Sequence, residues 1–157
     1  MHGIGLLSLV LVNVKKVLSL EGPKGEEGKL FFRLVDIAVD RQGNIYVADA
    51  GASKIYKLDQ DGNLLLSFGT YGRGPGDLSN PFMDIAVSDN GDIFVVNVNN
   101  NRINKFSKDG QFVTSCMKSP ALQVAINSSE DVYVCPGTQG YILDKFDSDL
   151  DYIEFYN

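Results

Sequence analysis

Histidine, paired cysteines and runs of basic residues are scarce in this chain, and each scarcity argues against a class of chemistry. Among the 157 residues the only histidine is His2, so a Ser-His-Asp or Cys-His arrangement has no base. Cys116 and Cys135 are the two cysteines. They form no CxxC pattern, so neither a zinc site nor a disulfide framework is predicted. We interpret them as small buried thiols, with a bridge between neighbouring strands as the alternative.

Positive charge is also in the minority. The chain has 14 Lys and Arg against 20 Asp and Glu, a formal net charge of −6. The longest basic run is Lys15-Lys16. Because a negative surface repels a phosphate backbone, the charge predicts no nucleic-acid partner.

No apolar run is long enough to span a membrane. The apolar stretch at residues 4–12 is about half the ~20 residues that a membrane helix needs. Basic residues follow this stretch instead of preceding it, which is the reverse of a signal peptide. Its valines favour a strand. We therefore expect the end of a strand unit here, with no membrane span and no signal peptide, and the compartment stays open.

What the chain does contain is an internal repeat. Residues 36–49 recur as residues 84–97, at an offset of 48. A third copy begins at residues 124–126, and residues 17–20 echo residues 65–68. The first copy reads as four short strands, at 35–40, 44–49, 54–59 and 64–68. Apolar and polar residues alternate in these strands, and Asn, Asp and Gly occupy the turns between them.

Four-stranded units at this period are typical of β-propeller blades. The sequence therefore predicts an all-β fold of four-stranded antiparallel blades. We assign residues 1–22 to the outer strands of a truncated blade, and residues 23–69, 70–117 and 118–157 to three further blades. Together they form one partial propeller domain of about 3.5 blades.

The motifs resemble a known repeat. Ile-Ala-Val-Asp at 37–40, Asn-Ile-Tyr-Val-Ala-Asp at 44–49 and the Asp-Gly turn at 61–62 resemble the NHL repeat. The glycine-rich loop at 71–77 is similar to that of bacterial six-bladed β-propeller proteins. The resemblance implies a six-bladed ring, and members of the bacterial type are often exported to the cell envelope. The third repeat departs from it, with Ser-Ser-Glu at 128–130 in place of the glycine turn.

Half a ring would leave strand edges exposed, and ring closure is what normally removes them. Two explanations stay open. The chain is a fragment of a longer protein, or two copies form a homodimer that closes the ring.

Chain direction places two sets of loops on one rim of such a ring, where ligands usually bind. Their amide, aromatic and arginine side chains suit recognition of a peptide, protein or glycan, although polar loops are ordinary in any protein. The rim candidates are Tyr71, Arg73, Asn99, Asn100, Asn101, Arg102, Gln139 and Tyr141.

A second group of candidates lies at the mouth of the central channel. Asp36 and Asp84 are equivalent in the repeat, and Gln123 takes their place in the third copy. Converging carboxylates could hold a cation or a basic group. The alternative is that each aspartate accepts hydrogen bonds from a neighbouring loop backbone. Asp49 and Asn97 are expected to cap the loops that follow them.

From these features we predict a non-catalytic NHL-type binding scaffold with no cofactor and no metal. The resemblance also implies rivals. Virginiamycin B lyases and peptidyl-hydroxyglycine lyases are propellers that depend on channel histidines, which this chain lacks. The alternative is therefore a fragment of a propeller enzyme, lyase-like or lactonase-like, that uses a channel-bound metal. RNA binding, as in animal NHL proteins, is disfavoured by the net charge of −6.

Overall fold

The computed structural model describes residues 31–79, 83–117, 121–137 and 143–156. Residues 1–22, assigned above to a truncated blade, lie outside the described part of the chain, as do Gln139 and Tyr141. Within the described residues, no helix has the length and apolar character that crossing a membrane requires.

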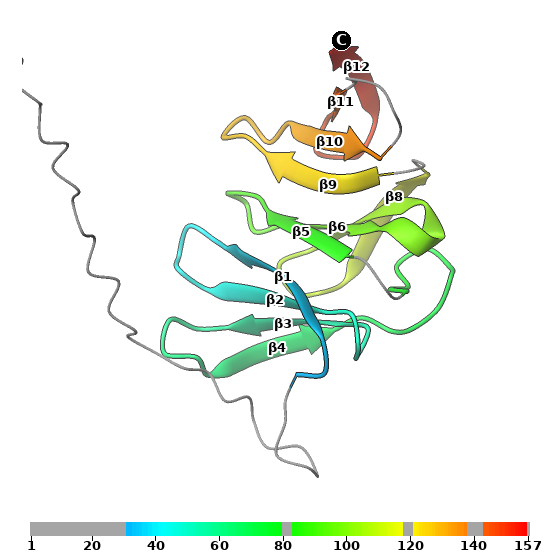
Figure 1. Ribbon diagram of the computed structural model, residues 1–157. Helices are drawn as coiled ribbons and strands as arrows, with labels where there is room; N and C mark the ends of the chain where they lie inside the picture. The colour runs from blue at the N-terminus through cyan, green and yellow to red at the C-terminus, as the bar shows by residue number, and fades with distance from the viewer. Residues whose placement is uncertain (1–30, 80–82, 118–120, 138–142, 157) are drawn as a thin grey trace, which may run out of the picture.

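Three antiparallel sheets of four strands each follow one another along the chain (Figure 1). Blade 1 contains β1 (Leu34–Val39), β2 (Ile45–Asp49), β3 (Lys54–Leu58) and β4 (Leu64–Phe68). Blade 2 contains β5 (Met83–Val87), β6 (Ile93–Asn97), β7 (Arg102–Phe106) and β8 (Phe112–Met117), with the short 3₁₀ helix η1 (Val98–Asn100) between β6 and β7. Blade 3 contains β9 (Ala121–Ile126), β10 (Val132–Pro136), β11 (Leu143–Phe146) and β12 (Tyr152–Tyr156).

The turn chemistry of the repeat explains why each sheet is a simple meander. In blade 1 the Asp40 carboxylate accepts hydrogen bonds from the backbone N–H groups of Gln42 and Asn44, at 3.0 and 2.8 Å. Gly43 completes this turn with a φ of 83°. Such a side-chain acceptor at the start of a turn shapes the backbone much as a hairpin bond does.

Blade 3 keeps the same turn without the glycine. The Asn127 side chain accepts from the N–H groups of Ser129 and Asp131, at 2.9 and 3.0 Å. Glu130 adopts a φ of 66°, where blades 1 and 2 have Gly43 and Gly91. The third repeat therefore lacks the glycine of the motif but keeps the same turn. Glu130 takes the left-handed backbone conformation there, which is unfavourable for a residue other than glycine.

The core lies between blades. One cluster joins Tyr46, Ala48 and Ile55 of blade 1 to Ile85 and Val95 of blade 2. A second cluster repeats the arrangement between blades 2 and 3. Each blade therefore buries one apolar face against the next, as blades do in a propeller.

The structure confirms the predicted fold class. The described residues form an all-β structure of four-stranded antiparallel blades with almost no helix.

Candidate functional site at the inner strands

The first strands of the three blades lie side by side, β1 next to β5 and β5 next to β9. Asp36, Asp84 and Gln123 occupy equivalent positions on these strands, opposite Ala48, Val96 and Cys135 of the second strands. A pocket of about 370 Å³ opens over this row. Its lining residues are Asp36, Ile37, Asp84, Ile85, Gln123, Val124, Ala125, Tyr133, Cys135 and Leu143.

Both carboxylates in the row contact the next blade. The Asp36 Oδ2 accepts a hydrogen bond from the N–H of Ile85 at 2.8 Å. In the same way, Asp84 Oδ2 accepts from the N–H of Val124 at 2.7 Å. The acceptors expected from the sequence are thus present, and their donors belong to the neighbouring inner strand instead of a loop. Each aspartate both joins two blades and lines the pocket.

The pKa of the Asp84 carboxyl is raised above its ordinary value. The pKa of Asp84 is raised to about 6, chiefly by burial and also by the charge and side chain of Asp36, against the lowering effect of the hydrogen bond from the Val124 N–H. A like charge nearby disfavours ionisation of a buried acid. The pocket therefore contains an acid that titrates close to neutral pH.

This raised pKa gives the stability of the protein a defined pH dependence. The folded pKa of Asp84, about 6, lies above the value of about 3.9 for an unfolded aspartate. The folded state consequently binds more protons between these values, and the contribution of Asp84 to stability is full below pH 4 and lost as the pH rises through 6.

We expect Asp84→Asn to be more stable than the parent chain at pH 8 by about 1–2 kcal/mol, after allowance for partial exposure, and equal to it at pH 4. Urea unfolding followed by circular dichroism at several pH values measures the difference. Asp61→Asn makes the same charge change on an exposed turn, and its difference from the parent should stay flat. A flat difference for Asp84→Asn as well would contradict the prediction.

The rim candidates form a separate cluster. The loop that contains Tyr71 and Arg73 is held to η1, where the Asn100 side chain donates to the carbonyl of Gly72 at 3.0 Å. Tyr71, Arg73, Asn99 and Asn101 are exposed on these two adjoining loops. Arg102 instead turns to β8 and donates to Ser115 Oγ at 3.2 Å. None of the rim residues lines the inner pocket among the described residues.

Asp49 and Asn97 belong to the framework below the rim. The buried Asp49 carboxylate accepts from the N–H groups of Gly51 and Ala52, in the loop that it was expected to cap. It also accepts from the N–H groups of Phe32 and Arg33. Asn97 does not cap the loop that follows it as expected, since its side chain makes no cap hydrogen bond to η1; it instead accepts from Ser79 Oγ and donates to the Asp77 carbonyl, in the loop before β5.

The structure corrects the interpretation of the cysteines. Cys135 is exposed, Cys116 is half-buried, and they form no disulfide. Cys135 lies on the face of blade 3 that has no further blade against it among the described residues, which is why a small residue of a buried repeat position reaches solvent. The sequence gives the repeat position of Cys135, which matches Ala48 and Val96, but not its exposure, because both of those residues are buried.

No metal centre emerges from the described residues, which contain no group of three or more His, Cys, Asp or Glu side chains able to hold an ion. The acidic stretch at 147–151 forms a hairpin turn, in which the Asp147 side chain accepts from the N–H groups of Asp149 and Asp151, both at 2.9 Å.

Comparison with solved structures identifies the architecture as propeller-like. The chain is similar to a streptogramin B lyase structure, with a TM-score of 0.60 and 22% identity over 78% of this chain and 40% of that one. A protein of unknown function from Bacteroides caccae gives a TM-score of 0.63 and 18% identity over 79% and 46%. A putative exported protein from Bacteroides fragilis gives 0.64 and 14% over 84% and 39%. The chain spans less than half the length of each of these proteins.

No protein-family model matches the chain, and no curated protein matches it. The assignment to the NHL repeat family therefore stays a prediction from the motifs.

One prediction needs correction. The sequence was interpreted as that of a protein that is not an enzyme, mainly because it lacks channel histidines. The structural similarity to streptogramin B lyase overturns this exclusion, because an enzyme is built on the same blades. A propeller fold hosts catalysis as well as binding.

Proposed function

We propose that this propeller segment recognises a basic group, the amine or guanidinium of a peptide or protein, in the pocket over its inner strands. The observation that carries the proposal is the pair of carboxyls, Asp36 and Asp84, in a pocket of about 370 Å³. A pocket of this size is within the range of ligand sites. At and above neutral pH its charge is negative, so a cation is the complementary ligand.

The neighbouring groups support a peptide as the ligand. Tyr133 and Leu143 give the pocket an apolar wall beside the acids, which suits the aliphatic stem of a lysine or arginine. On the rim, Tyr71, Arg73, Asn99 and Asn101 offer further polar and aromatic contacts to an extended chain. The motifs of the repeat favour an NHL-type scaffold for this role.

A second candidate is an enzyme, lyase-like or lactonase-like, whose channel contains these acids. An acid with a pKa of about 6 is matched to proton transfer near neutral pH, which favours Asp84 as a general acid or base. In the metal-dependent form of this candidate, Asp36 and Asp84 would be ligands of the ion.

Binding of a fluorescent oligolysine peptide, followed by anisotropy, tests the first candidate. We expect Asp36→Asn and Asp84→Asn each to weaken binding about tenfold or more, because an ionic hydrogen bond contributes about 1.5–3 kcal/mol. Asparagine keeps an acceptor for the next blade, so the fold should be retained. Asp61→Asn is the matched control and should bind like the parent chain.

Two results would overturn the proposal. One is equal binding by the pocket variants and the Asp61→Asn control, and the other is preference for an oligoglutamate peptide or a neutral oligosaccharide. Metal retained after dialysis and lost in both pocket variants would favour the enzyme instead.

A further inference from the structure

The glycine-rich loop at 71–77 alternates small residues with large ones. The glycines at 72, 74 and 76 are half-buried, and the residues that alternate with them are exposed, namely Tyr71, Arg73 and Pro75. A Cβ at Gly72 would collide with the Asp77 carboxylate. A Cβ at Gly76 would lie 2.9 Å from the Phe112 ring. Glycine therefore lets the backbone of the loop pack closely, while the three larger side chains stay in solvent.

Three asparagines of blade 2 hold the backbone of this loop in place. Asn97 and Asn104 both donate to the Asp77 carbonyl, at 2.8 and 3.1 Å. Asn100 donates to the Gly72 carbonyl at 3.0 Å. Because Asn97 and Asn104 are fully buried, water competes poorly for their bonds. The loop is thus fixed before any ligand binds, which lowers the entropy cost of using it in an interface.

The loop presents two side chains, Tyr71 and Arg73, of the types that dominate the binding energy of protein interfaces. Tyr71 is 72% exposed, and a tyrosine loses little conformational entropy on contact. Arg73 forms no ion pair with a carboxylate of the described residues. Asp77, the nearest acid along the chain, accepts instead from the N–H of Gly74 at 2.8 Å. The Arg73 guanidinium is therefore available, and its planar fork matches a carboxylate.

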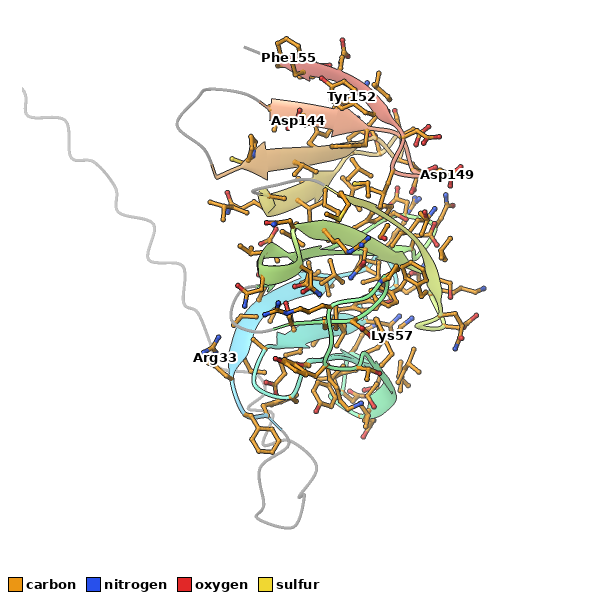
Figure 2. The ribbon with its side chains drawn as sticks, turned by 90° about the vertical axis from the view of Figure 1, so that its right-hand side faces the viewer. Arg33, Lys57, Asp144, Asp149, Tyr152 and Phe155 are labelled. Atoms are coloured by element: carbon orange, nitrogen blue, oxygen red, sulfur yellow. The ribbon has the colours of Figure 1, made fainter. Side chains whose placement is uncertain are left out.

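Basic residues gather around the loop, whereas the chain as a whole is acidic. Lys54 Nζ lies 3.4 Å from the carbonyl of Gly69, just before the loop, and Arg102 follows the η1 segment that holds it. Most acidic residues of the described chain lie in the hairpin turns at the other ends of the strands, as Figure 2 shows for Asp149 in the β11–β12 turn. The net charge of −6 therefore does not describe this loop, and a negative group is complementary to it.

We propose that the glycine-rich loop at 71–77 binds an acidic segment of a protein partner, whose carboxylate pairs with Arg73 while a neighbouring side chain packs on Tyr71. The acidic turns elsewhere repel a long polyanion, which favours a short acidic segment over a nucleic acid. Among the described residues, none from this loop lines the pocket over the inner strands. The inference therefore goes beyond the proposed function and does not depend on it.

Anisotropy of a fluorescent oligoglutamate peptide at low salt tests the proposal. We expect the parent chain to bind the peptide and Arg73→Gln to weaken binding about fivefold or more. Arg73→Lys should fall between them, because lysine keeps the charge but loses the fork. Arg41→Gln is the matched control, since Arg41 is exposed in the β1–β2 turn, and it should bind like the parent. Circular dichroism checks that every variant is folded.

Two more variants test how the loop binds. Tyr71→Ala should weaken binding about threefold or more through the lost aromatic contact. Asn100→Ala releases the Gly72 carbonyl and should weaken binding about threefold although Asn100 does not touch the peptide, because the loop is no longer held in advance. The Asp36→Asn and Asp84→Asn variants report on oligolysine and the Arg73 variants on oligoglutamate, so each site can fail alone.

Three results would overturn the proposal. The first is no binding of oligoglutamate by the parent chain, and the second is equal binding by Arg73→Gln and Arg41→Gln. The third is tighter binding of a single-stranded oligonucleotide than of oligoglutamate, lost in Arg73→Gln, which would assign the loop to a nucleic acid instead of a protein.

Discussion

Replacing Phe94 by alanine is expected to lower the free energy of unfolding by about 3–5 kcal/mol, the cost of removing a fully buried aromatic side chain from a core that relaxes only partly. Phe94 is 1% exposed and packs in the cluster between blades 2 and 3. Its ring also lies under Lys105 Nζ, 5.7 Å from the centroid. Urea unfolding at neutral pH measures the loss.

The repeat supplies a matched control for this substitution. Tyr133 occupies the position of Phe94 one blade later and lies under Lys145 in the same way, at 5.9 Å. Its environment differs, since it faces the open side of blade 3, and its hydroxyl accepts a hydrogen bond from the Asn127 side chain at 3.4 Å. Tyr133→Ala should lower the free energy of unfolding by less than about 1 kcal/mol, as is usual for partly exposed sites. Equal costs for the two variants would show that burial between blades is not what stabilises the stack.

Asp49→Ala is expected to have a comparably large effect, a loss of about 3 kcal/mol or more. The buried carboxylate accepts four backbone N–H groups, from Phe32, Arg33, Gly51 and Ala52, at 2.7 to 3.1 Å. Asp49 itself is 0% exposed, so water replaces its carboxylate poorly where the β2–β3 loop meets the start of β1, and a donor left unsatisfied there costs about 1–3 kcal/mol. Thermal unfolding by circular dichroism measures the change.

Asp59→Ala is the appropriate comparison. Asp59 likewise accepts from backbone N–H groups, those of Asp61 and Asn63, at 2.9 and 2.8 Å. Its bonds are exposed, so water replaces the carboxylate when it is removed, and a much smaller loss than that of Asp49→Ala is expected. If the Asp49→Ala and Asp59→Ala variants lose the same stability, burial of the Asp49 carboxylate is not what makes its hydrogen bonds important.

Much of the fold could be predicted because each strand and turn of the repeat is specified by residues close together in the chain. Asp40, Gly43 and Asn44 specify a turn by their own hydrogen bonds, and alternating residues on either side specify strands with one apolar face. The strand predicted at 64–68 is β4 as observed, and the other three of that copy differ by one residue at one or both ends. Blade 3 was harder to predict, since Glu130 holds a conformation that glycine usually marks.

Only part of the candidate site could be predicted from the sequence. The equivalence of Asp36, Asp84 and Gln123 follows from the repeat alone. Their hydrogen bonds do not, because Ile85 and Val124 become donors only when the inner strands of successive blades lie side by side. The shift in the acidity of Asp84 has the same origin, since burial and the approach of Asp36 depend on the packing of one blade against the next.

The sequence by itself therefore determined the all-β class, the period of the blades, their turns and the row of equivalent polar positions, because these depend on residues close together in the chain. Only the tertiary structure decided which face of each blade is buried, which carboxyl titrates near neutral pH, and that Cys135 is exposed and not buried. Those properties come from contacts between blades some 40 to 48 residues apart, and identical repeat positions acquire different environments according to whether another blade lies against them.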